Sequence, residues 1–146
     1  MILVSACLLG INCKYNGKNN KNENVINYLK DKQYIIACPE QLGGLSTPRN
    51  PSEIIKVNKN EIVKSNTGLD VTYNFTKGAN ECLNIAKIYG CAEAILKEGS
   101  PSCGSNYIYD GTFSGNKIQG EGVTTSLLRK HGIKVISENE VFKNIK

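Results

Sequence analysis

Four short apolar runs, separated by segments with helical spacing, constrain the possible folds of this chain more than any other feature. The runs cover residues 2–6, 34–37, 92–96 and 133–136. Apolar residues recur at helical spacing in residues 24–32, from Asp70 or Thr72 to Tyr89, and in residues 122–130. This alternation predicts a parallel sheet with helices on both faces. A chain of 146 residues has the size of one domain. We therefore expect a single three-layer, Rossmann-like α/β domain with a mostly parallel sheet over residues 1–146.

A small hairpin is expected as an insertion after the second strand. Residues 53–57 and 61–64 flank a turn-like sequence at residues 58–60. We expect this hairpin to cover one edge of the functional site. A short C-terminal helix is expected after the last strand.

Hydropathy and charge exclude several classes of protein. No apolar run approaches the roughly 18 to 20 residues that a membrane span requires. The N-terminal sequence MILVSACLLG lacks a basic leader, so it is interpreted as a first strand, and we expect a cytoplasmic protein without a membrane partner. The net charge is +5, but the basic residues are dispersed. No basic stripe interleaved with aromatic residues indicates a nucleic-acid polymer as a partner.

The six cysteines point to chemistry rather than to a disulfide framework. They form no CxxC pair, and the chain has one histidine, His131, so the ligand spacing of zinc fingers is absent. Three of the six follow predicted strands: Cys7 after the first, Cys38 after the second and Cys103 on the loop after the third. Because loops that leave the carboxyl ends of parallel strands converge on one side, these three thiols should meet there.

Three converging thiolates fit zinc, an iron–sulfur cluster or a transient disulfide. Soft thiolate ligands without histidine favour iron–sulfur or zinc. Because complete clusters usually have four cysteine ligands, three ligands would leave one iron of a [4Fe-4S] cluster unbound by protein.

The remaining cysteines differ in their expected roles. Cys82 falls on the apolar face of the long helix and Cys91 begins a buried strand, so both are interpreted as packing residues. Cys13 lies six residues after Cys7. A fourth ligand, an active-site thiol and an uninvolved neighbour are equally compatible with its position.

Seven segments carry a resemblance to a known family: SACLLG, CKYNG, CPEQLGGLSTPRNPSEI, TGLDVT, LKEGSPSCG, IYDGTFSG and GEGVTTSLL. Together they resemble the thiouracil desulfidase family, small iron–sulfur proteins formerly described as a domain of unknown function. The resemblance runs from Met1 to about Glu138. It implies a [4Fe-4S] cluster held by Cys7, Cys38 and Cys103, and a non-redox reaction that gives uracil and sulfide from a thiolated pyrimidine. Free thiouracil, thiouridine and its monophosphate are all compatible substrates, and a monomer or a dimer is expected.

The resemblance also implies two acid/base residues, Glu40 and Ser100, with Cys13 as a further candidate. Glu40 could take a proton from the attacking water, and Ser100 could bond to the ring or relay a proton. Taken alone, Glu40 is as well explained as a carboxylate at a helix start, and Ser100 as a turn residue. The sequence departs from the family at Asn16, where many relatives carry aspartate, so no carboxylate acts there.

Weaker candidates and two other functions complete the sequence interpretation. The amides of GEGVTT, with Gly120, Gly122 and Thr124, fit an anion site or a simple helix cap. Arg49 fits a carbonyl or phosphate clamp as well as a surface salt bridge, and His131 has no catalytic role. The alternative function is a non-catalytic iron–sulfur or zinc module for metal or sulfide storage, transfer or sensing. A thiol oxidoreductase that uses Cys7 and Cys13 is less compatible, because no CxxC motif begins a helix.

Overall fold

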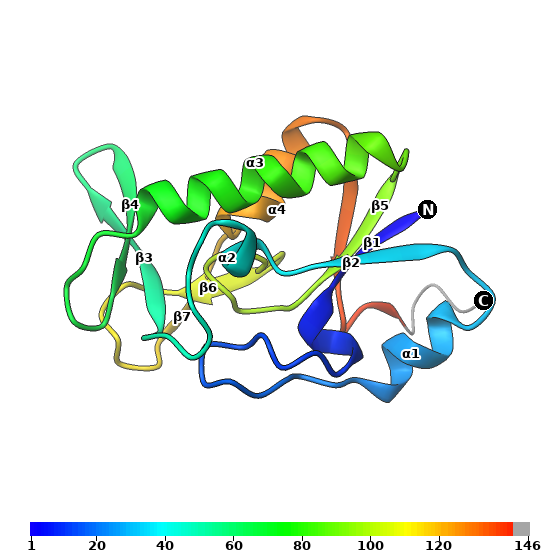
Figure 1. The fold of residues 1–146 in the computed structure, drawn as a ribbon. Helices are drawn as coiled ribbons and strands as arrows, with labels where there is room; N and C mark the ends of the chain where they lie inside the picture. Colours follow the sequence, from blue (N-terminus) through cyan, green and yellow to red (C-terminus); the bar gives the residue numbers. More distant parts are fainter. Residues whose placement is uncertain (142–146) are drawn as a thin grey trace.

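The computed structural model describes residues 1–141 and has a four-stranded parallel sheet at its centre (Figure 1). The strand order is β2-β1-β5-β8, and all three neighbouring pairs are parallel. The strands are β1 (Ile2–Ser5), β2 (Tyr34–Ala37), β5 (Glu93–Leu96) and β8 (Lys134–Ser137). The predicted α/β class is confirmed, and β2 has the predicted limits.

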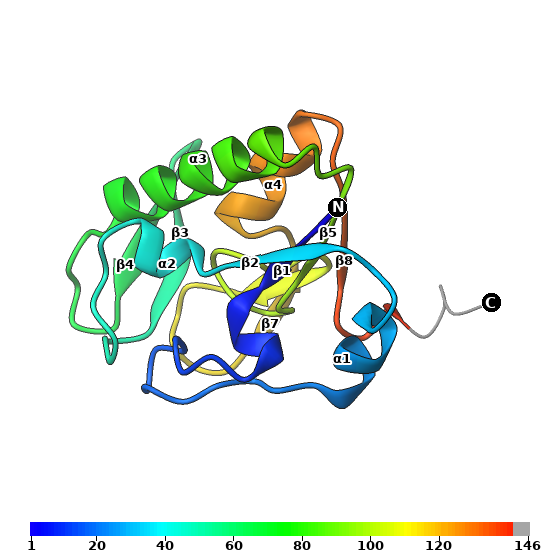
Figure 2. The same ribbon diagram turned by 45° about the vertical axis from the view of Figure 1, so that its right-hand side comes forward.

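Helices cover both faces of the sheet, as the alternating pattern predicts (Figure 2). One face packs against α3 (Thr72–Ile88) and α4 (Val123–Lys130), where Leu3 and Ala94 meet the helix residue Cys82. The other face packs against α1 (Glu23–Leu29), where Val4 meets Val25. Neighbouring residues of β1 therefore serve different layers, because successive side chains of a strand point to opposite faces.

Two hairpins lie outside the central sheet. The predicted one is confirmed as β3 (Ser52–Val57) paired with β4 (Asn60–Ser65). The second, β6 (Tyr107–Tyr109) paired with β7 (Lys117–Gln119), was not predicted and occupies part of the long loop between β5 and α4. Both hairpins are antiparallel and form sheets of their own, so the central sheet is wholly parallel.

Two short helices begin directly after strands and carry cysteines. A 3-10 helix (η1, Ala6–Leu9) follows β1 and contains Cys7. Helix α2 (Pro39–Leu42) follows β2 and has Cys38 as its N-cap residue. Proline suits the first position of a helix because its missing N–H would have no partner there.

The expected C-terminal helix falls mainly on residues 142–146, which lie outside the described residues. Within residues 1–141, no helix is both long and apolar enough to cross a membrane.

Candidate active site

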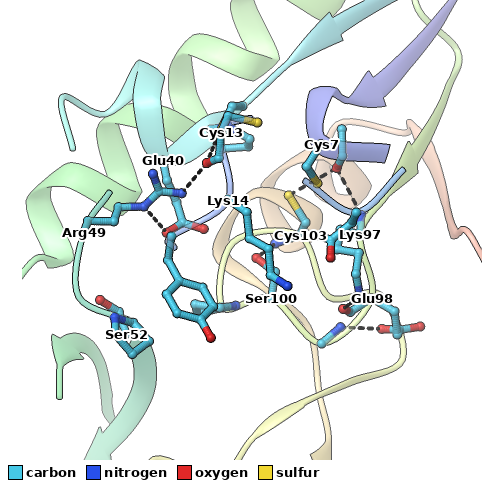
Figure 3. A pocket seen from close by; sticks show the side chains of 18 of the residues that line it. Cys7, Cys13, Lys14, Glu40, Arg49, Ser52, Lys97, Glu98, Ser100 and Cys103 are labelled. Carbon is cyan, nitrogen blue, oxygen red and sulfur yellow. Dashed lines mark hydrogen bonds and ion pairs between the residues drawn. The ribbon is translucent and has the colours of Figure 1, made fainter. Parts of the chain in front are cut away.

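A cavity of about 540 Å³ lies at the carboxyl ends of the central strands and gathers the predicted site residues (Figure 3). Its wall contains four of the six cysteines together with a carboxylate, an arginine, a lysine and a serine: Cys7, Cys13, Cys38, Cys103, Glu40, Arg49, Lys97 and Ser100. The topological argument that selected Cys7, Cys38 and Cys103 therefore selected residues of one cavity. Glu53 of β3 also lines it, so the hairpin borders the site as predicted.

The thiol of Cys13 connects two of the cysteines. Its interactions with the sulfurs of Cys38 and Cys7, together with burial, raise the pKa of Cys13 above its ordinary value, and the Cys38 sulfur lies 3.8 Å from the carbonyl oxygen of Cys13. All six cysteines of the chain are free thiols. Cys13 is therefore a buried thiol that interacts with two sulfurs and favours its own protonated form, a role that its position in the sequence left open.

Cys38 is the thiol with the strongest tendency to ionise. The interaction with Cys13 lowers its pKa to about 6 against the effect of burial, helped by the backbone of Gln41, while the opposite charges of Glu40 and Arg49 largely offset each other. The pKa of Cys7 is also lowered, first by the Cys13 bond and then by Asn20 and Lys97. Two of the three predicted ligands are thus in surroundings that favour the thiolate, the form that binds metals.

Cys103 lies deeper and differs electrostatically from the other two. Burial raises the pKa of its thiol to about 12, although Ser5 donates a hydrogen bond to the sulfur at 3.5 Å. A coordinated metal ion deprotonates a thiol outright, so this high pKa is compatible with a ligand role. Within residues 1–141, no three Cys, His, Asp or Glu side chains form a compact site for a single metal ion.

The buried carboxylate of Glu98 shapes the loop that carries Cys103. Its Oε1 accepts hydrogen bonds from the backbone N–H groups of Ser105 at 2.8 Å and Asn106 at 2.9 Å, and its Oε2 accepts one from the Asn106 side chain at 2.6 Å. Burial alone would raise the pKa of Glu98, but these donors lower it to about 2. Sequence reasoning missed Glu98, although a glutamate two residues after an apolar strand was the available signal.

Lys97 is a second residue that sequence reasoning missed. Its Nζ lies 3.0 Å from Oε2 of Glu138 and donates to the carbonyl oxygen of Glu98 at 2.8 Å. Burial lowers the pKa of Lys97, but Glu138 outweighs it and the net pKa is raised. A protonated lysine therefore faces the cavity and favours the Cys7 thiolate.

The N-terminus of α4 binds the Cys103 loop instead of an anion. The N–H groups of Val123 and Thr124 donate to the carbonyl oxygens of Pro101 and Ser102, both at 2.9 Å, and the Thr125 hydroxyl donates to the carbonyl oxygen of Cys103 at 2.8 Å. The anion-site reading of GEGVTT, with Gly120, Gly122 and Thr124, is therefore wrong. A Cβ on Gly122 would lie 2.4 Å from the carbonyl carbon of Ser102, so only glycine permits this close approach.

Glu40 and Arg49 form a largely buried ion pair in the cavity wall. Nε of Arg49 lies 3.0 Å from Oε1 of Glu40, and the two side chains are 7% and 18% exposed (Figure 3). The same guanidinium donates to the carbonyl oxygen of Cys13 at 2.8 Å. Arg49 thus combines the salt bridge and the carbonyl clamp that the sequence offered as alternatives, but the carbonyl is the protein's own and the pair is not at the surface.

Ser100 supports its own turn and also lines the cavity. Its Oγ accepts hydrogen bonds from the N–H groups of Ser102 at 3.0 Å and Cys103 at 3.1 Å. Its own hydroxyl proton has no acceptor among residues 1–141. Ser100 therefore fits the turn interpretation and still has a donor available to a ligand.

The other expected assignments agree with the structure. Cys82 and Cys91 are buried in the core between the sheet and helices α3 and α4, and burial raises the pKa of both thiols. The His131 ring bonds to the carbonyl oxygen of Leu127 at the end of α4, at 3.1 Å, and is absent from the cavity wall.

Fold and cavity together define the class: a parallel α/β protein whose ligand site is lined by thiols at the carboxyl ends of its strands. The family model described as 2-thiouracil desulfurase matches residues 2–140, so the chain belongs to that family. The expected family and the expectation of a thiouracil desulfidase enzyme are confirmed.

Two relatives match over nearly the whole chain. The uncharacterized protein YbbK of Bacillus subtilis (strain 168) is 48% identical over 147 residues, which are 97% of this chain and 97% of YbbK. The solved structure of a [4Fe-4S]-dependent thiouracil desulfidase, TudS, is 44% identical, with a TM-score of 0.88, and the match covers 97% of this chain and 93% of TudS.

Proposed function

We propose that this protein is a [4Fe-4S]-dependent desulfidase that hydrolyses the carbon–sulfur bond of thiolated uracil without redox chemistry. The observation that carries the proposal is the meeting of Cys7, Cys38 and Cys103, from three neighbouring strands, on one cavity with Glu40 and Ser100. The family match and the likeness to TudS support it.

The donor set of the cavity fits an iron–sulfur cluster. Cys7 and Cys38 favour the thiolate form, and Cys103 lines the same cavity from the loop after β5. The ligands of a cluster bind different irons, so they need not meet at one point as the ligands of a single ion must. Three ligands would leave one iron without a protein ligand. We assign Cys13 the role of donor to Cys7 and Cys38 rather than that of a fourth ligand.

When bound, the cluster would supply a Lewis acid that polarises the thiocarbonyl sulfur. The residues of the chain then act on water and on the pyrimidine. Oε1 of Glu40 is held by Arg49, while Oε2 has no partner within the described part of the chain, so Oε2 can accept a proton from the attacking water. The hydroxyl of Ser100 can donate to the pyrimidine ring, because its oxygen is already fixed by two N–H groups.

The proposed reaction balances without an external oxidant or reductant. The C=S group becomes C=O with an oxygen from water, and both hydrogens of that water leave with the sulfur as hydrogen sulfide. The cavity of about 540 Å³ is of the size that small-molecule sites have, so we propose thiouracil, thiouridine and its monophosphate as substrates. We also propose that the protein is cytoplasmic, because six free thiols are typical of a reducing compartment. We propose a monomer or a dimer, without nucleic-acid polymers as partners.

Anaerobic reconstitution tests the proposal. The chain should bind four irons per protein, and it should release sulfide from 2-thiouracil or 4-thiouracil with an equal amount of uracil. Cys7→Ala, Cys38→Ala and Cys103→Ala should each lose the cluster, whereas the packing variant Cys82→Ala should keep it. A cluster that forms while no thiouracil compound releases sulfide would contradict the enzyme and favour a module for metal or sulfide storage, transfer or sensing.

A further inference from the structure

The tip of the β6–β7 hairpin presents an aromatic ring to the cavity from a strained backbone position. Phe113 lines the cavity and has φ of 56°, in the left-handed region that side chains other than glycine and asparagine rarely adopt. It is one of two residues other than glycine with positive φ within residues 1–141; the other is Asn58, in the β3–β4 turn. Strain of this kind persists only where surrounding contacts hold it, and it concentrates at ligand sites.

Contacts from another hairpin hold this tip in place. Oε1 of Glu53, on β3, accepts hydrogen bonds from the N–H groups of Gly111 at 2.9 Å and Phe113 at 3.2 Å. Asp110 accepts bonds from the N–H and the hydroxyl of Thr112, which braces the loop from within. The strained conformation is therefore fixed from two sides, and its result is the position of the Phe113 side chain.

Core packing does not explain this position. Phe113 is 36% exposed and belongs to none of the three buried clusters among the described residues. The backbone of Phe113 is strained and held by hydrogen bonds, while its ring stays accessible from the cavity. This combination indicates that the ring contacts a ligand in the cavity.

We propose that Phe113 is a substrate-positioning residue whose ring stacks on the planar pyrimidine. This inference rests on the proposed function for the identity of its ligand. Stacking suits this site because every pyrimidine has a π face, whatever its thiolation. Glu53 acts through Phe113 by holding the loop. The cysteines, Glu40 and Ser100 would act at the reacting carbon and sulfur, while Phe113 selects for a flat ring.

Substitutions at Phe113 separate stacking from simple hydrophobic cover. In the cluster-loaded enzyme, Phe113→Ala and Phe113→Leu should both raise KM for thiouracil by about tenfold, because leucine keeps the apolar bulk but has no π face. Phe113→Gly should raise KM equally while unfolding at the same or a higher temperature, because glycine has no penalty at positive φ. The control is Tyr73→Ala, on a side chain 75% exposed on α3 and absent from the cavity wall, which should leave KM unchanged. A wild-type KM in Phe113→Leu overturns the stacking role.

A second measurement is independent of activity, because the chain contains no tryptophan. Phe113→Trp places a single reporter at the cavity, and uracil should quench its fluorescence saturably, both with and without the cluster. Tyr73→Trp should show no saturable quenching. If uracil does not quench Phe113→Trp, the inference about Phe113 fails even when the wild type releases sulfide. If uracil quenches it but the wild type releases no sulfide, ring binding stands and the proposed reaction fails.

Discussion

Single side chains set the charge of the thiols in this cavity. Cys13 donates to two sulfurs and keeps its own proton, so it stabilises the thiolates of Cys38 and Cys7. Lys97 adds a positive charge on the Cys7 side, whereas on the Cys38 side the charge of Arg49 is opposed by that of Glu40. The preference of Cys7 and Cys38 for the thiolate thus depends on residues other than the proposed ligands.

Removal of the Cys13 thiol should raise the pKa of Cys38 in the cluster-free protein. The wild-type value is about 6, so at neutral pH most of Cys38 is thiolate, and Cys13→Ala should move the pKa toward the ordinary 9.0. Alkylation of Cys38 by iodoacetamide at pH 7, followed by peptide mass mapping, should then slow by about tenfold or more, because only the thiolate reacts. Cys91→Ala, in the core, is the control. If Cys38 is alkylated at the wild-type rate in Cys13→Ala, Cys13 does not set this pKa.

Glu98 should make the stability of the protein depend on acid pH. Its pKa is about 2 in the folded state and 4.5 ordinarily, so its contribution is complete above pH 4.5 and is lost as pH falls through about 2. Glu98→Gln should lower the free energy of unfolding by about 2–3 kcal/mol at pH 7, because one of the two buried acceptor oxygens becomes an NH2 group that faces the side-chain N–H of Asn106. The difference from wild type should shrink toward pH 2.5 in urea titrations. Glu81→Gln, on an exposed residue of α3, should change stability little at either pH, and an equal effect of Glu98→Gln at both pH values would contradict the linkage.

At the scale of elements, the sequence predicted the long helix and the central strands, and it also predicted which cysteines follow those strands. Helix α3 was predicted because its helical periodicity extends over 17 residues, and the four central strands because each is an apolar run. Helix α2 has four residues and β6 and β7 three each, which is too short for any period to show. The Glu98 contacts and the Cys13 bonds join residues of irregular loops, where no spacing rule applies. Consequently the position of Cys7, Cys38 and Cys103 at the strand ends was predictable, and the residues that shift the pKa of these thiols were not.

The crossing of α2 and α3 places Cys38 and Glu40 and gives a test at this scale. A Cβ on Gly78 of α3 would lie 1.9 Å from the carbonyl oxygen of Pro39, so the two helices touch through backbone. Gly78→Ala should force α2 outward, destabilise the protein by about 1–3 kcal/mol in urea and lower the iron content after reconstitution. Lys77→Ala, on the exposed side of the same helix, should leave both unchanged. Full iron content in Gly78→Ala would show that α2 does not need this contact.

Considered as a whole, the molecule builds most of its core away from the cavity. Two apolar layers lie on either side of the sheet, around Leu3 and around Val4, and only their edges, at Cys103 and Cys7, reach the cavity. The proposed ligands lie at the strand ends, next to segments fixed by Glu98, by the N-terminus of α4 and by Arg49. The fold is therefore expected to form before any cluster is bound, unlike small metal domains that are unfolded without metal.

Removal of the cluster should loosen the cavity and leave the sheet intact. Stripping iron anaerobically with a chelator should leave the far-ultraviolet circular dichroism unchanged and lower Tm by about 5–10 °C, because a ligand that binds only the folded state stabilises it. Hydrogen exchange should accelerate in residues 7–13 and 97–105, while β1 and β5 stay protected. Cys103→Ala, which cannot hold the cluster fully, should have a Tm that does not respond to the chelator. Loss of helical signal on stripping would show instead that the cluster is required for folding, and an unchanged Tm in the wild type would show that the three strand ends are not joined through it.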